Sequence, residues 1–243
     1  KLLTDSKGLP KLINGTFDWA YEEEFGCLDG FRWSPDGESI AYWQIDANNI
    51  RDFYMINTTD SIYSYTIPVE YPKVGETPSA ARIGVVNVAS GTTKWMNIPG
   101  DDRQNYIPRM EWAGNSEDLI LQQLNRKQNQ SKLMYVNVAS GDARSFYEES
   151  DDAWISVRSS WDSGNGWYWV NDGKSFLWIT EKDGWRHIYN VDRDGEEEVL
   201  VTKGAFDVIS PLAVDEKERY VYYMASPEDA TESYLYRSRL NGK

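Results

Sequence analysis

The residues Val85-Val86-Asn87-Val88-Ala89-Ser90-Gly91 return almost unchanged as Tyr135-Val136-Asn137-Val138-Ala139-Ser140-Gly141. Looser copies end at Gly195 and at Gly242. Each copy alternates apolar and polar residues and stops at a glycine, which is typical of a strand that leads into a hairpin turn. A return at intervals of roughly 50 residues is the signature of a repeat architecture.

A second unit lies upstream of the first in each repeat. Trp33-Ser34-Pro35-Asp36-Gly37 precedes an apolar run, and similar units begin at Trp112 and Trp169, with a fainter one at Val214. Turn-forming residues between two apolar runs predict strand, tight turn and strand. Two such units per repeat give four strands, which is the composition of a β-propeller blade. We expect Trp33, Trp112 and Trp169 to pack in the core between blades.

The fold class is therefore predicted as all-β, a partial β-propeller of roughly four blades of four antiparallel strands. Residues 1–243 form one domain, with blades at about 31–99, 109–149, 166–204 and 210–243 and an insertion at 44–81. Residues 1–30 hold the last strand of an upstream blade, expected at Lys1–Thr4, and a glutamate-rich segment. Two alternatives follow for this strand. The chain is a segment of a longer protein, which we favour, or this strand completes the last blade and closes a four-bladed ring.

Composition narrows the function. The 243 residues carry a net charge of −14, so binding to nucleic acid is disfavoured, because phosphate contacts need a basic surface. No apolar run approaches the ~18 residues of a membrane span, and we expect no membrane insertion. Cys27 is the only cysteine and His187 the only histidine, which excludes an internal disulfide and multi-histidine or cysteine-rich metal sites. We expect no metal and no cofactor.

Catalysis by this segment is not expected either. The sequence has no Gly-x-Ser-x-Gly elbow, and a catalytic triad needs an oriented base within reach of a nucleophile. His187 lies in a strand-like stretch and is expected to be packed or hydrogen-bonded there. We assign no catalytic residue.

One acidic stretch is a candidate site. In Phe17-Asp18-Trp19-Ala20-Tyr21-Glu22-Glu23-Glu24-Phe25, three carboxylates stand between large aromatic residues. The nine residues alone leave two interpretations open, a solvated face or a site for a primary ammonium group. Thr16 or Asp18 can cap a short helix that carries the glutamates. Neighbouring helical positions point about 100° apart, so only two of the three can share one target.

The same stretch resembles the propeller domain of the dipeptidyl peptidase IV family, in the prolyl oligopeptidase clan. The resemblance includes Asp18 to Glu24, the unit Arg32 to Gly37, Tyr71-Pro72-Lys73-Val74-Gly75 and Gly184-Trp185-Arg186-His187-Ile188-Tyr189. It therefore spans most of the chain, and its most specific part is Asp-Trp-x-Tyr-Glu-Glu-Glu.

The resemblance implies an eight-bladed propeller that caps an α/β-hydrolase domain and gates the cavity between them. Family members are serine-type dipeptidyl aminopeptidases, hydrolases that release dipeptides from peptides with Pro or Ala second. Their second and third glutamates bind the peptide amino terminus, which corresponds to Glu23 and Glu24 as substrate-binding residues here. The implied partners are the peptide amino terminus and the missing hydrolase domain. A second copy of the chain, in a homodimer, is a further expected partner. The implied location is exported, periplasmic or at the cell surface.

This chain also departs from the family. The Gly-Trp-Ser-Tyr-Gly-Gly nucleophile elbow is absent, as is the upstream blade with its substrate-binding arginine. A later pocket loop would fall near Trp161–Trp167, where the residues do not match, so no role is carried over. Whether the protein is an enzyme is thus open, and the alternative is a non-enzymatic propeller that serves as a protein-interaction scaffold.

Overall fold

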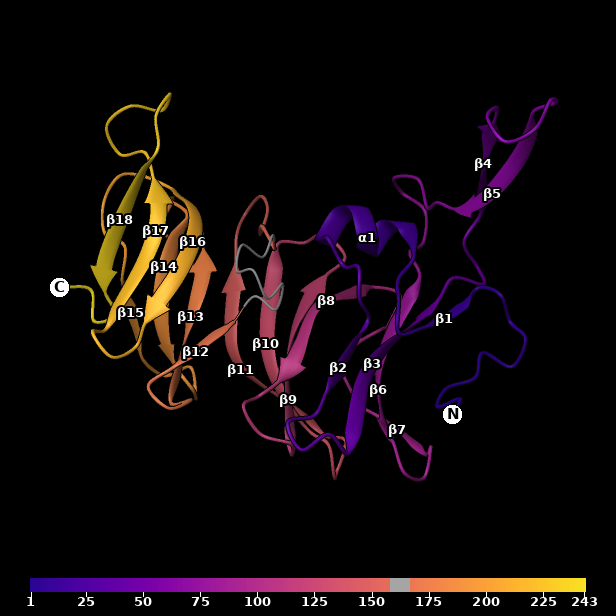
Figure 1. Ribbon diagram of the computed structural model, residues 1–243, viewed down its shortest axis with the longest axis horizontal. Coiled ribbons are helices and arrows are strands. Elements are labelled where there is room, and N and C mark those ends of the chain that lie inside the picture. Colours follow the sequence, from indigo (N-terminus) through magenta and orange to yellow (C-terminus); the bar gives the residue numbers. More distant parts are fainter. Residues whose placement is uncertain (158–166) are drawn as a thin grey trace.

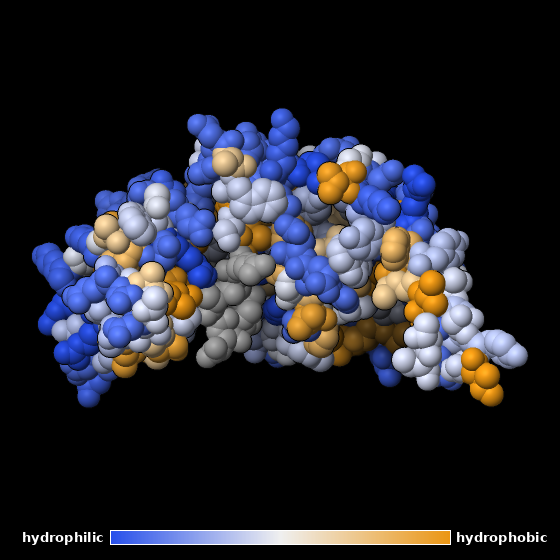
Figure 2. Space-filling view, turned by 90° about the horizontal axis from the view of Figure 1, so that it is seen from above, coloured by the Kyte–Doolittle hydropathy of each residue, from blue (hydrophilic) through white to orange (hydrophobic). Residues whose placement is uncertain are grey.

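The computed structural model describes residues 1–157 and 167–243. Within these residues the chain forms four antiparallel sheets that stand side by side, a separate two-stranded hairpin and one α-helix (Figure 1). Seen from above, the row of sheets has a curved outline (Figure 2). The predicted fold class, all-β with antiparallel blades of a propeller, is confirmed.

The strands of each sheet follow one another along the chain. The first sheet comprises β1 (Leu12–Asn14), β2 (Phe31–Trp33), β3 (Ser39–Asp46), β6 (Ala80–Asn87) and β7 (Thr93–Trp95). The second comprises β8 (Asn105–Trp112), β9 (Asp118–Asn125), β10 (Gln130–Asn137) and β11 (Ala143–Ser150). The third comprises β12 (Tyr168–Val170), β13 (Ser175–Thr180), β14 (His187–Asp192) and β15 (Glu198–Leu200). The fourth comprises β16 (Val208–Asp215), β17 (Tyr220–Ala225) and β18 (Tyr234–Arg239).

The repeated Asn-Val-Ala-Ser-Gly motif forms the same turn in the first and second sheets. The Asn87 side chain accepts a hydrogen bond from the Ser90 backbone N–H at 2.9 Å, and Asn137 accepts one from Ser140 at 2.9 Å. Each motif ends at a glycine with positive φ, a conformation that costs glycine little because it has no Cβ. The sequence repeat is therefore a repeat of turn chemistry.

Each pair of neighbouring sheets shares its own hydrophobic core. In β9, Leu119 and Leu121 pack in the core between the first and second sheets, whereas Ile120 packs between the second and third. In β13, Phe176 belongs to the core between the second and third sheets and Leu177 to that between the third and fourth. Successive residues of a strand point to opposite faces, so the central strands are apolar on both sides.

The structure does not contain the strand predicted at residues 1–4. Residues 1–4 form no strand, and the first strand, β1, pairs with the outer half of β3 within the first sheet. The two termini lie at opposite ends of the row of sheets (Figure 1). A ring of four blades closed by Lys1–Thr4 is therefore wrong. A strand predicted from four residues at the edge of a repeat has no hydrophobic period to support it.

The three tryptophans expected between blades, Trp33, Trp112 and Trp169, differ in their burial. Trp112 is buried and donates from its indole N–H to the Arg32 carbonyl at 3.1 Å, which joins the second sheet to the first. Trp169 is half-buried with its ring edge-on to Phe176. Trp33, however, is 52% exposed, so its expected place between blades is wrong. Arg32 faces the second sheet, and its neighbour Trp33 must face the other way.

The insertion between β3 and β6 forms a projecting hairpin of β4 (Asp52–Asn57) and β5 (Tyr65–Glu70), which we call the arm. It extends away from the sheets, at the upper right of Figure 1. Its apolar side chains are mostly exposed, including Ile56 at 70%, Ile62 at 97% and Tyr63 at 85%. The insertion predicted at 44–81 corresponds to residues 47–79, between β3 and β6.

Candidate functional site

The acidic stretch forms the helix α1 (Trp19–Phe25) at one end of the first two sheets (Figure 1). Asp18 is the N-cap, and its side chain accepts a hydrogen bond from the Tyr21 backbone N–H at 3.1 Å. The helix ends at Phe25, and the left-handed backbone of the following Gly26 brings the Cys27 N–H to the Tyr21 carbonyl at 3.2 Å. A carboxylate at the start and glycine at the end are the residues that these positions favour. Of the two caps considered from the sequence, Asp18 is the one used.

The helix has one buried and one exposed side. Tyr21 and Phe25 are 1% and 2% exposed and lie in the core between the first and second sheets. Residues four apart on a helix share a face, so these two anchors place Glu22, Glu23 and Glu24 on the remaining surface. All three glutamates are exposed. The sequence is therefore amphipathic over only two turns, with the carboxylates directed to solvent.

Tyr21 is the main anchor of α1. Its ring packs against Phe17, Phe25 and Tyr106. Its hydroxyl accepts a hydrogen bond from the Ile107 backbone N–H of β8 at 3.1 Å. Burial raises the pKa of Tyr21 well above its usual value, so the phenol stays neutral. The helix is thus attached to the second sheet through a polar contact as well as by packing.

The carboxyl end of α1 is held by Arg109 of β8. This side chain is 7% exposed and donates to the Phe25 carbonyl at 3.0 Å and to the Val157 carbonyl at 2.8 Å. A cation at the last carbonyls complements the helix dipole. Burial lowers the pKa of Arg109, although an arginine side chain remains charged at neutral pH. Sequence reasoning missed this residue, since nothing in its local pattern marks it.

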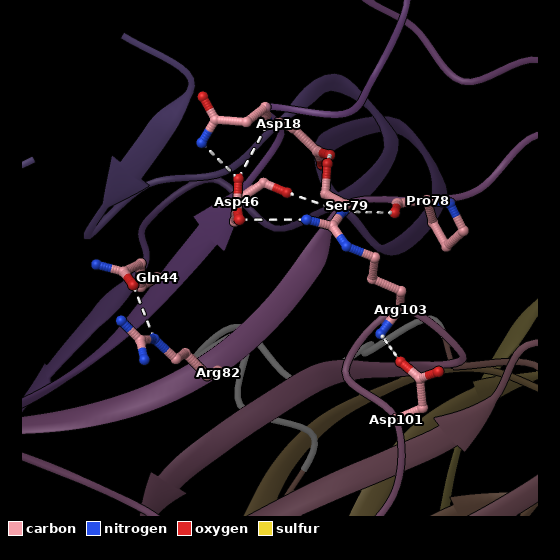
Figure 3. Close-up of polar contacts among 9 residues, drawn as sticks. Asp18, Gln44, Asp46, Pro78, Ser79, Arg82, Asp101 and Arg103 are labelled. Carbon is pink, nitrogen blue, oxygen red and sulfur yellow. Dashed lines mark hydrogen bonds and ion pairs between the residues drawn. The ribbon is translucent and has the colours of Figure 1, made fainter. Parts of the chain in front are cut away.

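The amino end of α1 is joined to the base of the insertion. The Ser79 hydroxyl donates to the second oxygen of Asp18 at 2.5 Å, and both residues are buried. Next to it, the Arg103 guanidinium binds the Asp46 carboxylate at 3.2 Å and the Pro78 carbonyl at 3.3 Å (Figure 3). These contacts connect α1, both ends of the insertion and the loop before β8.

Tyr106 lies within the electrostatic influence of both Glu24 and Arg126. Burial raises the pKa of Tyr106, an effect that Arg126 opposes and the charge of Glu24 adds to. The Arg126 guanidinium lies 5.7 Å from the Tyr106 ring centre. Within residues 1–157 and 167–243, Glu23 and Glu24 have no ion-pair partner. Both side chains are exposed.

The other residues singled out in the sequence lie elsewhere. His187 is 1% exposed at the start of β14, with its Nδ1 2.8 Å from an Asp183 carboxylate oxygen. This confirms it as a packed, hydrogen-bonded strand residue in the third sheet. Residues 161–166 of the loop Trp161–Trp167 lie outside the described residues. No group of acidic, histidine and cysteine side chains among those described is arranged to hold a metal.

In the part of the chain that the structure describes, no helix is both long enough and apolar enough to cross a membrane.

Comparison with known proteins gives a consistent result. The model of a family described as "Dipeptidyl peptidase IV (DPP IV) N-terminal region" matches residues 2–243. Dipeptidyl peptidase 4 of Trichophyton rubrum is 28% identical over 97% of this chain, and that of Trichophyton equinum is 27% identical over 96%. The chain spans 31% of the length of each. The crystal structure of Porphyromonas gingivalis dipeptidyl peptidase 4 matches 99% of the chain and 33% of its own, with a TM-score of 0.88 and 29% identity.

Cys27 gives a test of how firmly the end of α1 is packed. Its thiol is 8% exposed, and burial raises its pKa to about 11 against the opposing charge of Arg109. A protonated, buried thiol is a poor nucleophile. We expect an aromatic disulfide reagent at pH 8 to label the folded protein at least ~100-fold more slowly than the protein in denaturant. Equal rates in the two states would show that this end of the helix is open.

Proposed function

Because the chain belongs to the dipeptidyl peptidase IV family, as part of its N-terminal region, we propose that Glu23 and Glu24 bind the free amino terminus of peptide substrates. The observation that carries the proposal is their placement. Both carboxylates are exposed on a helix whose other side is buried between two sheets. The Asp-Trp-x-Tyr-Glu-Glu-Glu string supports it independently, since the family's second and third glutamates correspond to these two.

The chemistry of the two carboxylates suits a peptide amine. An α-amino group titrates near pH 8, so most of it is charged at neutral pH. An ammonium group donates three hydrogen bonds, and charge-assisted bonds to carboxylates are short and strong. Recognition of the charge also explains selection for a free terminus, because an acylated amine carries no charge and leaves the carboxylates unpaired.

The proposed activity of the full-length protein rests on its membership of the family. We propose that the intact protein is a serine-type dipeptidyl aminopeptidase, with an α/β-hydrolase domain that carries the nucleophile. The sheets described above then gate access to the cavity between the two domains. They bind the substrate and do not cut it. Export to the periplasm or cell surface belongs to the same proposal and rests on the family alone.

The glutamates can be tested separately. In the full-length protein, we expect Glu23→Gln and Glu24→Gln each to lower kcat/KM on dipeptidyl p-nitroanilides about 30-fold or more, because each removes one charged partner of the amine. Thermal stability should change little, since both side chains are exposed.

Glu22→Gln is the matched control, because it removes the same charge from the same helix. It should leave kcat/KM within about threefold if only the second and third carboxylates face the substrate. Full activity of the Glu23 and Glu24 variants would contradict the anchoring role.

The arm favours a second role, in association between copies. Its exposed apolar side chains, among them Ile56, Ile62 and Tyr63, form a hydrophobic hairpin that projects into solvent. Figure 2 shows hydrophobic surface at the right-hand end of the molecule, where Figure 1 places the arm. Large exposed apolar patches mark interaction sites. We propose that the arm binds a second copy of the protein in a homodimer.

The alternative to an enzyme is a non-enzymatic propeller that serves as a protein-interaction scaffold. A missing serine elbow in the full-length protein would favour this alternative.

The association can be measured by analytical ultracentrifugation. We expect the full-length protein to sediment as a dimer and the double variant Ile56→Asp with Ile62→Asp as a monomer, because buried charges oppose the interface. Val74→Asp, an exposed position beyond the hairpin, serves as the control and should remain dimeric. A dimer that withstands both arm substitutions would place the interface elsewhere.

A further inference from the structure

The insertion touches the glutamate helix at two points, both at its base. Ser79 precedes β6 and donates its hydroxyl hydrogen bond to Asp18, the N-cap. Tyr71 follows β5, and its ring centre lies 4.1 Å from that of Trp19, the first residue of α1. The two contacts therefore reach consecutive residues at the start of the helix, and both come from the segment 71–79 between β5 and β6.

We propose that the base of the arm positions the substrate-binding glutamates, with Ser79 acting through Asp18 and Tyr71 acting through Trp19. Ser79 and Tyr71 are positioning residues, and neither touches substrate. The inference rests on the proposed function of Glu23 and Glu24. It adds a role to residues that lie in the insertion, outside the four sheets of the scaffold.

The Asp18 side chain has little freedom to move, because both of its oxygens accept hydrogen bonds. One of its oxygens accepts from the Tyr21 N–H and the other from Ser79, and Asp18 itself is 5% exposed. A buried carboxylate that loses a donor must turn or admit water, because an unpaired charge is costly in the interior. Since the same side chain caps α1, any turn changes the direction in which the helix begins.

The base itself is fixed to the body of the protein. The Arg103 guanidinium spans the two ends of the insertion, binding Asp46 at the end of β3 and Pro78 before β6 (Figure 3). The backbone N–H of Arg103 donates to the Asp101 carboxylate in the loop before β8. Ser79 is therefore held at a defined place relative to the second sheet, which also holds Tyr21.

The Tyr71 contact continues into the arm. The Tyr71 ring lies 5.5 Å from Phe53 of β4, and Phe53 lies under the Lys73 ammonium group at 5.9 Å. Aromatic contacts at these separations fix relative orientation as well as burying area. Trp19 is 37% exposed, so Tyr71 covers a side chain that would otherwise be free to move.

The test measures KM and kcat of the full-length protein on a dipeptidyl p-nitroanilide. We expect Ser79→Ala and Tyr71→Ala each to raise KM about three- to tenfold with kcat within about twofold, because the carboxylates are misplaced and the nucleophile is not. Tyr71→Phe keeps the ring and should restore the wild-type KM. Should Ser79→Ala fail to fold, the Tyr71 pair still decides.

Asn115→Ala is the matched control for general loosening. Asn115 accepts two backbone hydrogen bonds, each of 2.8 Å, in the turn after β8 at the other end of the sheet, and its loss should leave KM unchanged. An equal rise in KM for Asn115→Ala, or none for Ser79→Ala and Tyr71→Ala, would overturn the positioning role. Glu23→Gln in the same assay separates the two proposals. If it lowers kcat/KM while the Ser79 and Tyr71 variants do not, only the positioning inference fails; if it has no effect, the amine site fails as well.

Discussion

A helix of seven residues does not persist in water on its own, because its first turn costs more conformational entropy than its few hydrogen bonds return. The placement of the glutamates therefore depends on the burial of Tyr21 and Phe25 between the first and second sheets. Polar contacts at three places also fix the orientation of the helix. Asp18 and Ser79 fix the beginning of the helix, the Ile107 N–H fixes Tyr21, and Arg109 holds the Phe25 carbonyl.

The two sheets beneath α1 are themselves joined by more than apolar packing. The Trp43 indole of the first sheet donates to the Ile107 carbonyl of the second at 2.8 Å, and the Trp112 indole donates back to the Arg32 carbonyl. Sites built on regular elements hold their geometry better than sites on loops, provided that the supporting groups are themselves fixed. The acidic helix meets this condition, because Tyr21 and Phe25 are buried between the two sheets. Repulsion between its three carboxylates destabilises the helix, and the packing of the helix against the sheets offsets this repulsion.

Much of the fold could be predicted from the sequence because it repeats. Asn87 and Asn137 mark identical turns, and the apolar alternation gives the strands between them. The prediction failed where no period exists, at residues 1–4, and where a repeated residue type does not indicate its direction, at Trp33. For the site, Glu23 and Glu24 follow from the family string and their exposure from the spacing of Tyr21 and Phe25. Ser79 could not be predicted, because a contact between residues 61 apart leaves no local pattern.

The proposed role of Glu23 and Glu24 requires that a peptide amine binds at α1. The most direct measurement is a crystal structure of the full-length protein with a dipeptide bound. We expect the dipeptide nitrogen to lie within hydrogen-bond distance, about 2.7–2.9 Å, of carboxylate oxygens of both Glu23 and Glu24. A dipeptide bound with its amine away from α1, and both glutamates still facing solvent, would contradict it.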